Sequence, residues 1–109
     1  MGDHDDPEVR QADAEVRQAE AARDQARARY DQADAAWKTL AYERLQADVW
    51  GKLTRDLAER EAAARQARND AWAPVVAANE RVRVAQHQAR MRLGGAGRLT
   101  GWAAARTRP

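Results

Sequence analysis

Arginine is the residue type with the most chemistry to offer in this sequence, and it gathers toward the C-terminus. Of the 19 lysines and arginines, only Lys38 and Lys52 are lysines. Glu80 is the last acidic residue, and seven arginines follow it. Basic side chains without neighbouring carboxylates are typical of surfaces that bind nucleic acid or another anionic partner. The candidate contacts, with Trp102 stacking on a base, are Arg81, Arg83, Arg90, Arg92, Arg98, Trp102, Arg106 and Arg108.

Two simpler interpretations of these arginines stay open. A solvated helix face explains the Arg81–Arg92 stretch better than a nucleic-acid surface does. A GC-rich coding sequence, as in many bacteria and their phages, would also favour arginine over lysine. A nucleic-acid-binding function through residues 81–108 is therefore the alternative prediction, and not the first.

The two histidines are the remaining candidates for catalysis or metal binding. If Met1 is removed, His4 becomes the third residue of the chain, a position that resembles an amino-terminal Cu(II) site. His87 has no acidic residue within one helical turn in the sequence, so no general-base relay is predicted. The chain also lacks Ser and Cys, the commonest nucleophiles. We expect no enzyme, no cofactor and no metal centre, with His4 as a weak exception.

Helices must position these residues, because the composition is that of a coiled coil. Hydrophobic residues make up 44% of the 109 positions and charged residues 33%, yet Phe, Ile and Cys are absent. Asp6 and Pro7 form a helix start, with Asp6 as the cap and Pro7 in the first turn. Gly94 and Gly95 form a helix stop. Between them, apolar residues recur at alternating steps of three and four, which predicts a helix–helix contact stripe, here called the seam. On the first helix the seam is Val9, Ala12, Val16, Ala19, Ala26, Tyr30, Ala33, Trp37, Leu40 and Ala47. On the returning segment it is Trp50, Leu53, Leu57, Ala64, Ala67, Ala71, Val75, Ala78, Val82, Ala85, Ala89 and Leu93.

Two breaks interrupt the predicted helical region. The spacing of the seam slips at Gly51, whereas it continues through Pro74, which favours a kink there. We therefore predict an all-α fold, a long antiparallel helical hairpin or coiled coil with its break near Gly51. A three-helix bundle with a break near residues 69–74 is the alternative. The predicted organisation is a flexible acidic leader (1–6), a helical hairpin domain (7–93) and a flexible basic tail rich in Gly and Arg (94–109).

The seam also indicates what the chain does. Most of its positions are Ala, which buries little apolar area, so two such helices alone would be only marginally stable. We expect self-association or docking onto a larger protein, and hence a non-enzymatic interaction or assembly function. No apolar run is long enough to cross a bilayer and no signal peptide is recognisable, so a cytoplasmic location is expected. The predicted interaction residues are Trp37, Leu40, Trp50, Leu53, Leu57, Trp72, Val75 and Val82.

The layout is similar in outline to the family of small secreted helical hairpins that carry a Trp-X-Gly motif near the midpoint. Here Trp50 and Gly51 are adjacent, whereas that family has one residue between them. The tail also lacks the family's C-terminal signal, a Tyr separated by three residues from an acid. Small helical phage assembly proteins are similar at the same coarse level. The resemblance therefore implies a two-helix architecture and nothing about specific residues.

Overall fold

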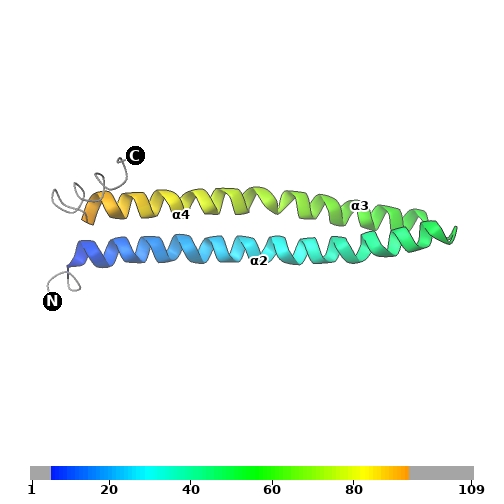
Figure 1. Cartoon of the computed structure of the whole chain (residues 1–109), viewed down its shortest axis with the longest axis horizontal. Coiled ribbons are helices and arrows are strands. Elements are labelled where there is room, and N and C mark those ends of the chain that lie inside the picture. The colour runs from blue at the N-terminus through cyan, green and yellow to red at the C-terminus, as the bar shows by residue number, and fades with distance from the viewer. Residues whose placement is uncertain (1–5, 94–109) are drawn as a thin grey trace, which may run out of the picture. The chain divides into compact units, whose positions relative to one another are not determined.

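The computed structural model describes residues 6–93, and within that range it contains helices and no strand. The helices are α2 (Pro7–Val49), α3 (Arg55–Asp70) and α4 (Trp72–Leu93), shown in Figure 1. The prediction of an all-α fold is confirmed. The tail at 94–109 and all of the leader except Asp6 lie outside the described residues. So do His4, Arg98, Trp102, Arg106 and Arg108.

The start of α2 is the one that the sequence predicts. A carboxylate oxygen of Asp6 accepts a hydrogen bond from the amide of Glu8 at 2.9 Å. The amide of Arg10 donates to the backbone carbonyl of Asp6 at 3.1 Å, which closes the first helical turn. Pro7 occupies the first helical position, where its missing N–H leaves no helical hydrogen bond unmade.

Gly51 ends α2 and allows the chain to reverse. Its φ of +67° lies in the left-handed region, which glycine enters without steric cost. The amide of Lys52 donates to the carbonyl of Ala47 at 2.7 Å, and that of Gly51 donates to Asp48 at 3.1 Å. This pair of bonds is a Schellman motif, which satisfies carbonyls that the helix end leaves open. Thr54 then starts α3, because its hydroxyl oxygen accepts from the amide of Leu57 at 3.1 Å.

The passage from α3 to α4 takes a single residue. Ala71 keeps a right-handed helical conformation, with φ −74° and ψ −12°, and its amide still donates to Ala67 at 3.0 Å. Pro74 explains the interruption, because it has no N–H for the carbonyl of Asp70 and its ring crowds that carbonyl. The second predicted break is therefore a bend, and the chain does not reverse there as a three-helix bundle requires.

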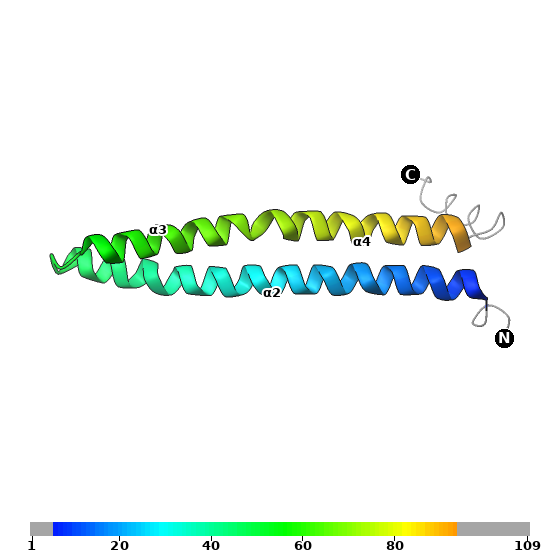
Figure 2. The same cartoon turned by 180° about the vertical axis from the view of Figure 1, so that it is seen from behind.

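The chain divides into two compact units. Unit 2 is Arg23–Ala77, in which α2 runs out to the turn and α3 returns beside it in the opposite direction. Unit 1 combines Met1–Ala22 with Ala78–Pro109, of which residues 6–22 and 78–93 are described. In unit 1 the start of α2 lies beside the end of α4, as both views in Figures 1 and 2 show. The predicted helical hairpin with its break at Gly51 is confirmed.

The core of each unit is thin. The buried apolar side chains are Ala12, Ala78 and Val82 in unit 1, and Ala26 and Val75 in unit 2. Every one of them lies on the predicted seam. The seam on the returning helices also contains Glu61, which is buried, and Arg68, which is half-buried. Ala67, expected on the seam, is instead exposed, because the step of four from Ala64 leads to Arg68.

Candidate interaction surface

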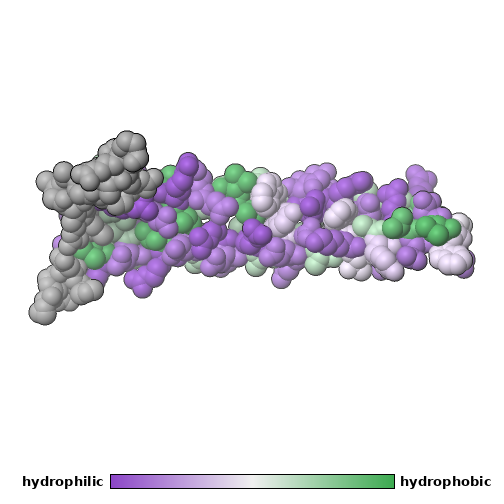
Figure 3. Space-filling view, viewed as in Figure 1, coloured by the Kyte–Doolittle hydropathy of each residue, from purple (hydrophilic) through white to green (hydrophobic). Residues whose placement is uncertain are grey.

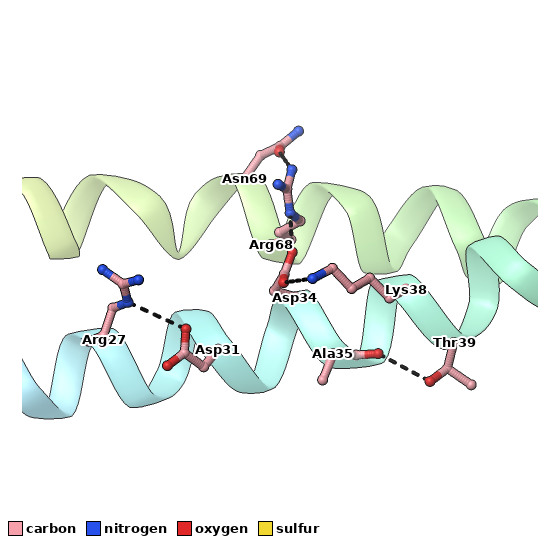
Figure 4. Close-up of polar contacts among 8 residues, drawn as sticks. All are labelled: Arg27, Asp31, Asp34, Ala35, Lys38, Thr39, Arg68 and Asn69. Carbon is pink, nitrogen blue, oxygen red and sulfur yellow. Dashed lines mark hydrogen bonds and ion pairs between the residues drawn. The ribbon is translucent and has the colours of Figure 1, made fainter.

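An ion pair across the two helices of unit 2 is the most structured polar feature of the described residues. Arg68 on α3 donates from Nε to Oδ1 of Asp34 on α2 at 2.7 Å. The other carboxylate oxygen of Asp34 lies 2.9 Å from Nζ of Lys38. Figure 4 shows Asp34 joined by dashed lines to Arg68 on α3 and to Lys38, one turn farther along α2. The Asp34 carboxylate therefore contacts Arg68, 34 positions away in the sequence, as well as Lys38 on its own helix.

Aromatic rings surround the Arg68 guanidinium. Its central carbon lies 4.8 Å from the ring centroid of Trp37 and 5.7 Å from that of Tyr30. Tyr30 in turn contacts Trp72 edge to face, with 5.1 Å between the ring centroids and 62° between their planes. Cations at this distance over an aromatic ring are attracted to its negative face. We call Tyr30, Asp34, Trp37, Arg68 and Trp72 the Arg68 cluster.

The charges in the Arg68 cluster shift one another's titration. The hydrogen bond from Lys38, followed by the one from Arg68, lowers the pKa of Asp34 below its usual value. The same bonds to Asp34 raise the pKa of Lys38 and that of Arg68. All three groups are therefore held in their charged forms at neutral pH. The cluster is therefore an electrostatic link between α2 and α3.

Glu61 is a buried carboxylate that packs against two arginines. It is 6% exposed, and its Oε1 lies 3.5 Å from Nη1 of Arg44 on the opposite helix. Its Oε2 lies 3.8 Å from Nη2 of Arg65 on the same helix and has no hydrogen-bond partner among the described residues. The buried Nε1 of Trp37 also has none there. Buried polar groups in a helix seam favour one register over others at a cost in stability.

Large apolar side chains are exposed on both sides of the turn in unit 2. Their exposed fractions range from 37% for Leu53 to 72% for Trp50. Figure 3 shows hydrophobic green atoms gathered beside the turn, at the right of the view. Exposed apolar patches of this kind mark contact sites more often than isolated apolar residues do. We call this the tip patch, and it consists of Tyr42, Leu45, Val49, Trp50 and Leu53.

The predicted interaction residues fall into two groups. Val75 and Val82 are buried in the seam, and Trp37, Leu40 and Leu57 are half-buried there. Trp50, Leu53 and Trp72 are exposed. Trp50 and Leu53 leave the seam because the Schellman motif ends α2 and turns the chain between them. The structure thus separates residues packed between the helices from exposed ones, and the exposed Trp72 still contacts Tyr30 of α2.

The arginines of unit 1 are exposed, but several of them have acidic partners. Arg83 lies 2.8 Å from Glu80 on the same helix, and that contact raises the pKa of Arg83. Arg92 on α4 lies 3.2 Å from Glu15 on α2, with each side chain 38% exposed. Arg81 and Arg90 are also exposed on α4. The predicted anion-binding residues that the structure describes therefore form a mixed-charge surface.

Two features of the site were missed by the sequence reasoning. Glu61 and Arg68 lie on the seam, but a search for apolar residues passes over them. Their signal was the spacing itself, because strict alternation of four and three from Leu57 selects 61, 64, 68, 71 and 75. Asp34 lies beside the seam and carried no signal of its own.

Within residues 6–93 no group of three or more potential metal-ligating side chains comes together. His87 lies exposed on α4. No helix in that range has the length and apolar character needed to span a membrane. Compared with models of protein families, with curated proteins and with solved structures, the chain has no match in any of the three.

Proposed function

We propose that this chain is a non-enzymatic interaction protein, which contacts another protein through the tip patch of its helical hairpin. The observation that supports the proposal is the exposure of five large apolar side chains on either side of one turn. Two of them, Tyr42 and Trp50, are aromatic residues at 64% and 72% exposure. Tryptophan and tyrosine dominate the binding energy of many protein interfaces.

The seam cannot account for these residues. Tyr42, Leu45 and Val49 lie on the side of α2 opposite its seam positions, which include Leu40, Arg44 and Ala47. Leaving a Leu or Val side chain exposed forgoes ~1.5–3 kcal/mol of burial free energy. A surface that carries several such residues together is stabilised when another protein covers it. The partner in this proposal is either a second copy of the chain or a larger protein.

The pairing of the arginines favours a protein partner over nucleic acid. A carboxylate beside a guanidinium repels phosphate and weakens its binding at that position. Arg83 and Arg92 both contact glutamates. An assembly or adaptor role therefore fits the described residues better than binding of nucleic acid through residues 81–108.

The test is site-specific photo-cross-linking in the cells from which the chain comes. A photoreactive amino acid replaces Leu45 or Val49 in the tip patch, and cross-linked species are identified by mass spectrometry. We expect both positions to give the same protein adduct. The matched control is the same amino acid at Glu59, an exposed position on α3 outside the patch, and it should give none.

Cross-links to nucleic acid from the tip patch, or equal labelling from Glu59, would contradict the proposal. Light scattering of the purified chain with and without nucleic acid gives a second test. Binding that weakens steeply with added salt indicates phosphate contacts, whereas apolar association persists in salt.

A further inference from the structure

One exposed strip on the outer side of α2 in unit 2 carries no charge. Along this side, residues at alternating steps of three and four are all exposed and all uncharged. A helix face that meets only water ordinarily carries many charged residues. The absence of charge here extends the tip patch into a longer surface. We call it the outer face, and it consists of Gln25, Ala28, Gln32, Ala35, Thr39, Tyr42, Gln46 and Val49.

The outer face points away from α3. Figure 4 shows Ala35 and Thr39 on the side of α2 opposite to Arg68. The Thr39 hydroxyl donates to the carbonyl of Ala35 at 3.1 Å, so it has a partner inside its own helix. Covering this surface would therefore leave the threonine hydroxyl satisfied.

Charged residues line the two edges of the outer face in a self-complementary order. Asp31 and Lys38 lie on one edge, which also carries Asp24 farther from Ala35, and Arg29 and Glu43 lie on the other. Within each edge, the nearest acid and the base lie on opposite sides of Ala35 and at similar distances from it along the helix. If two copies of α2 lie antiparallel with a two-fold axis near Ala35, each base faces an acid of the other copy.

From this order we infer that the outer face binds a second copy of the chain, antiparallel and centred near Ala35. The inference rests on the proposed function and names the partner. In this arrangement Arg29 faces Glu43 of the second copy, and Tyr42 lies over the small side chain of Ala28. Arg29 and Glu43 make no ion pair within the described part of the chain. Asp31 and Lys38 already contact Arg27 and Asp34, at 3.4 Å and 2.9 Å, so pairing would extend those contacts.

The size of the surface sets the expected strength. From Gln25 to Val49 the face is ~36 Å long and ~10 Å wide, given the rise and diameter of a helix. That footprint is about half of the ~800 Å² per partner that a standard interface buries. Leu45 and Trp50 of the tip patch, which are not members of the outer face, add to it. We therefore expect a weak, reversible dimer with a micromolar dissociation constant.

Charge reversal tests the arrangement by sedimentation equilibrium of the full chain. Arg29→Glu or Glu43→Arg places like charges opposite each other twice in the dimer, and each should weaken dimerisation about tenfold. The double variant, Arg29→Glu with Glu43→Arg, should restore the affinity. The matched control is Arg55→Glu, since Arg55 lies in the same unit with its side chain 92% exposed and away from the outer face. It should leave the dissociation constant unchanged.

A disulfide tests the position of the two-fold axis, because the chain has no native cysteine. Ala35→Cys should form a covalent dimer under mild oxidation, since the two introduced thiols meet at the axis. Ala63→Cys, at an exposed position on α3, should stay monomeric under the same conditions. Equal cross-linking of the two variants would overturn the arrangement.

The outcomes separate the inference from the proposed function. A chain that stays monomeric at all concentrations overturns the inference, while a protein adduct at Leu45 still supports the proposed function. A dimer that resists charge reversal but dissociates with Leu45→Glu also overturns the inference, because the tip patch alone then carries association. A dimer lost in each single reversal and recovered in the double variant supports both.

Discussion

Units 1 and 2 are both antiparallel pairs of helix segments. Within each unit, however, different side chains hold the two segments together. In unit 1, small apolar residues such as Ala12 and Ala78 form the core, and the described ion pair across it joins two half-exposed side chains, Glu15 and Arg92. In unit 2, the Arg68 cluster adds three aromatic rings and a hydrogen-bonded ion pair at 2.7 Å. Unit 2 also contains the buried Glu61.

The difference shows what an alanine seam lacks. Alanine lets two helices approach closely, but it distinguishes poorly between one alignment and the next. Charged and aromatic residues can pair in one alignment only. We therefore interpret unit 2 as the part in which the register of the hairpin is specified, and unit 1 as a part that packs in the same register with less to enforce it.

The largest effect is expected from a charge in the core of unit 2. Val75 is 1% exposed, so Val75→Asp buries a carboxylate in a site built for an apolar side chain. We expect a loss of ~3 kcal/mol or more in the free energy of unfolding, measured by circular dichroism during urea denaturation. The control is Val76→Asp, because Val76 is 51% exposed and the same charge there meets water. Equal losses for the two variants would contradict the assignment of the core.

Removing the arginine that pairs with an acid across the helices, Arg68 in unit 2 and Arg92 in unit 1, tests the difference between the two units directly. Arg68→Met keeps the length of the side chain but deprives Asp34 and Trp37 of their contact. Arg92→Met removes the pair with Glu15 in unit 1, which should cost ~0.5 kcal/mol or less because both side chains are half-exposed. We expect Arg68→Met to lower the thermal midpoint at least twice as far as Arg92→Met. Equal shifts would show that the two units are held together in the same way.

Gly51 should give a smaller effect, and one that depends on the backbone alone. An added Cβ meets no atom within 4 Å, so Gly51→Ala introduces no clash. The positive φ should still cost ~1 kcal/mol, measured by urea denaturation. Gly51→Asn is the matched control, because Asn tolerates the left-handed region better, and it should cost less. A neutral Gly51→Ala would mean that the turn readily changes its conformation.

Acid should remove the contribution of Asp34. The pKa of Asp34 is lowered below its usual value of 3.8, so the ionised carboxylate stabilises the fold at pH values above 3.8. This stabilisation is lost as the pH falls from 3.8 toward the lowered pKa. The thermal midpoints of the chain and of Asp34→Asn should therefore differ at pH 7, and the difference should begin to shrink as the pH falls below about 3.8. A difference that stays constant down to pH 2 would exclude Asp34 as the titrating group. Asp24→Asn, at an exposed position, is the control.

Much of the fold follows from local signals in the sequence. Asp6 and Pro7 start a helix for two reasons. Asp6 accepts a hydrogen bond from a free amide of the first turn, and Pro7 lacks only an N–H that has no helical partner at that position. Gly51 ends it because the Schellman motif needs a positive φ, and Pro74 interrupts the returning helix because it lacks an N–H. Each of these is a property of a few neighbouring residues, so a single sequence is sufficient to predict it.

The Arg68 cluster is harder to predict, because its contacts depend on the register between two helices. Asp34 and Arg68 meet only when α2 and α3 align in one way, and the alanine-rich seam suggests several. The positions of Arg68 and Glu61 are recoverable from strict heptad spacing, whatever the residue type. Arg44, the partner of Glu61, also lies at a seam position. Asp34, the partner of Arg68, is not recoverable in this way, because it lies beside the stripe that the spacing identifies.

The gap at Pro74 has a consequence for how the returning arm comes apart. Pro74 has no amide hydrogen to donate to the carbonyl of Asp70. One of the backbone hydrogen bonds that would join α3 and α4 into a single cooperative helix is therefore missing. Local unfolding that starts in the last turn of α3 can end at this missing hydrogen bond instead of extending into α4. Amide exchange should then divide the arm into two kinetic blocks that meet at Ala71.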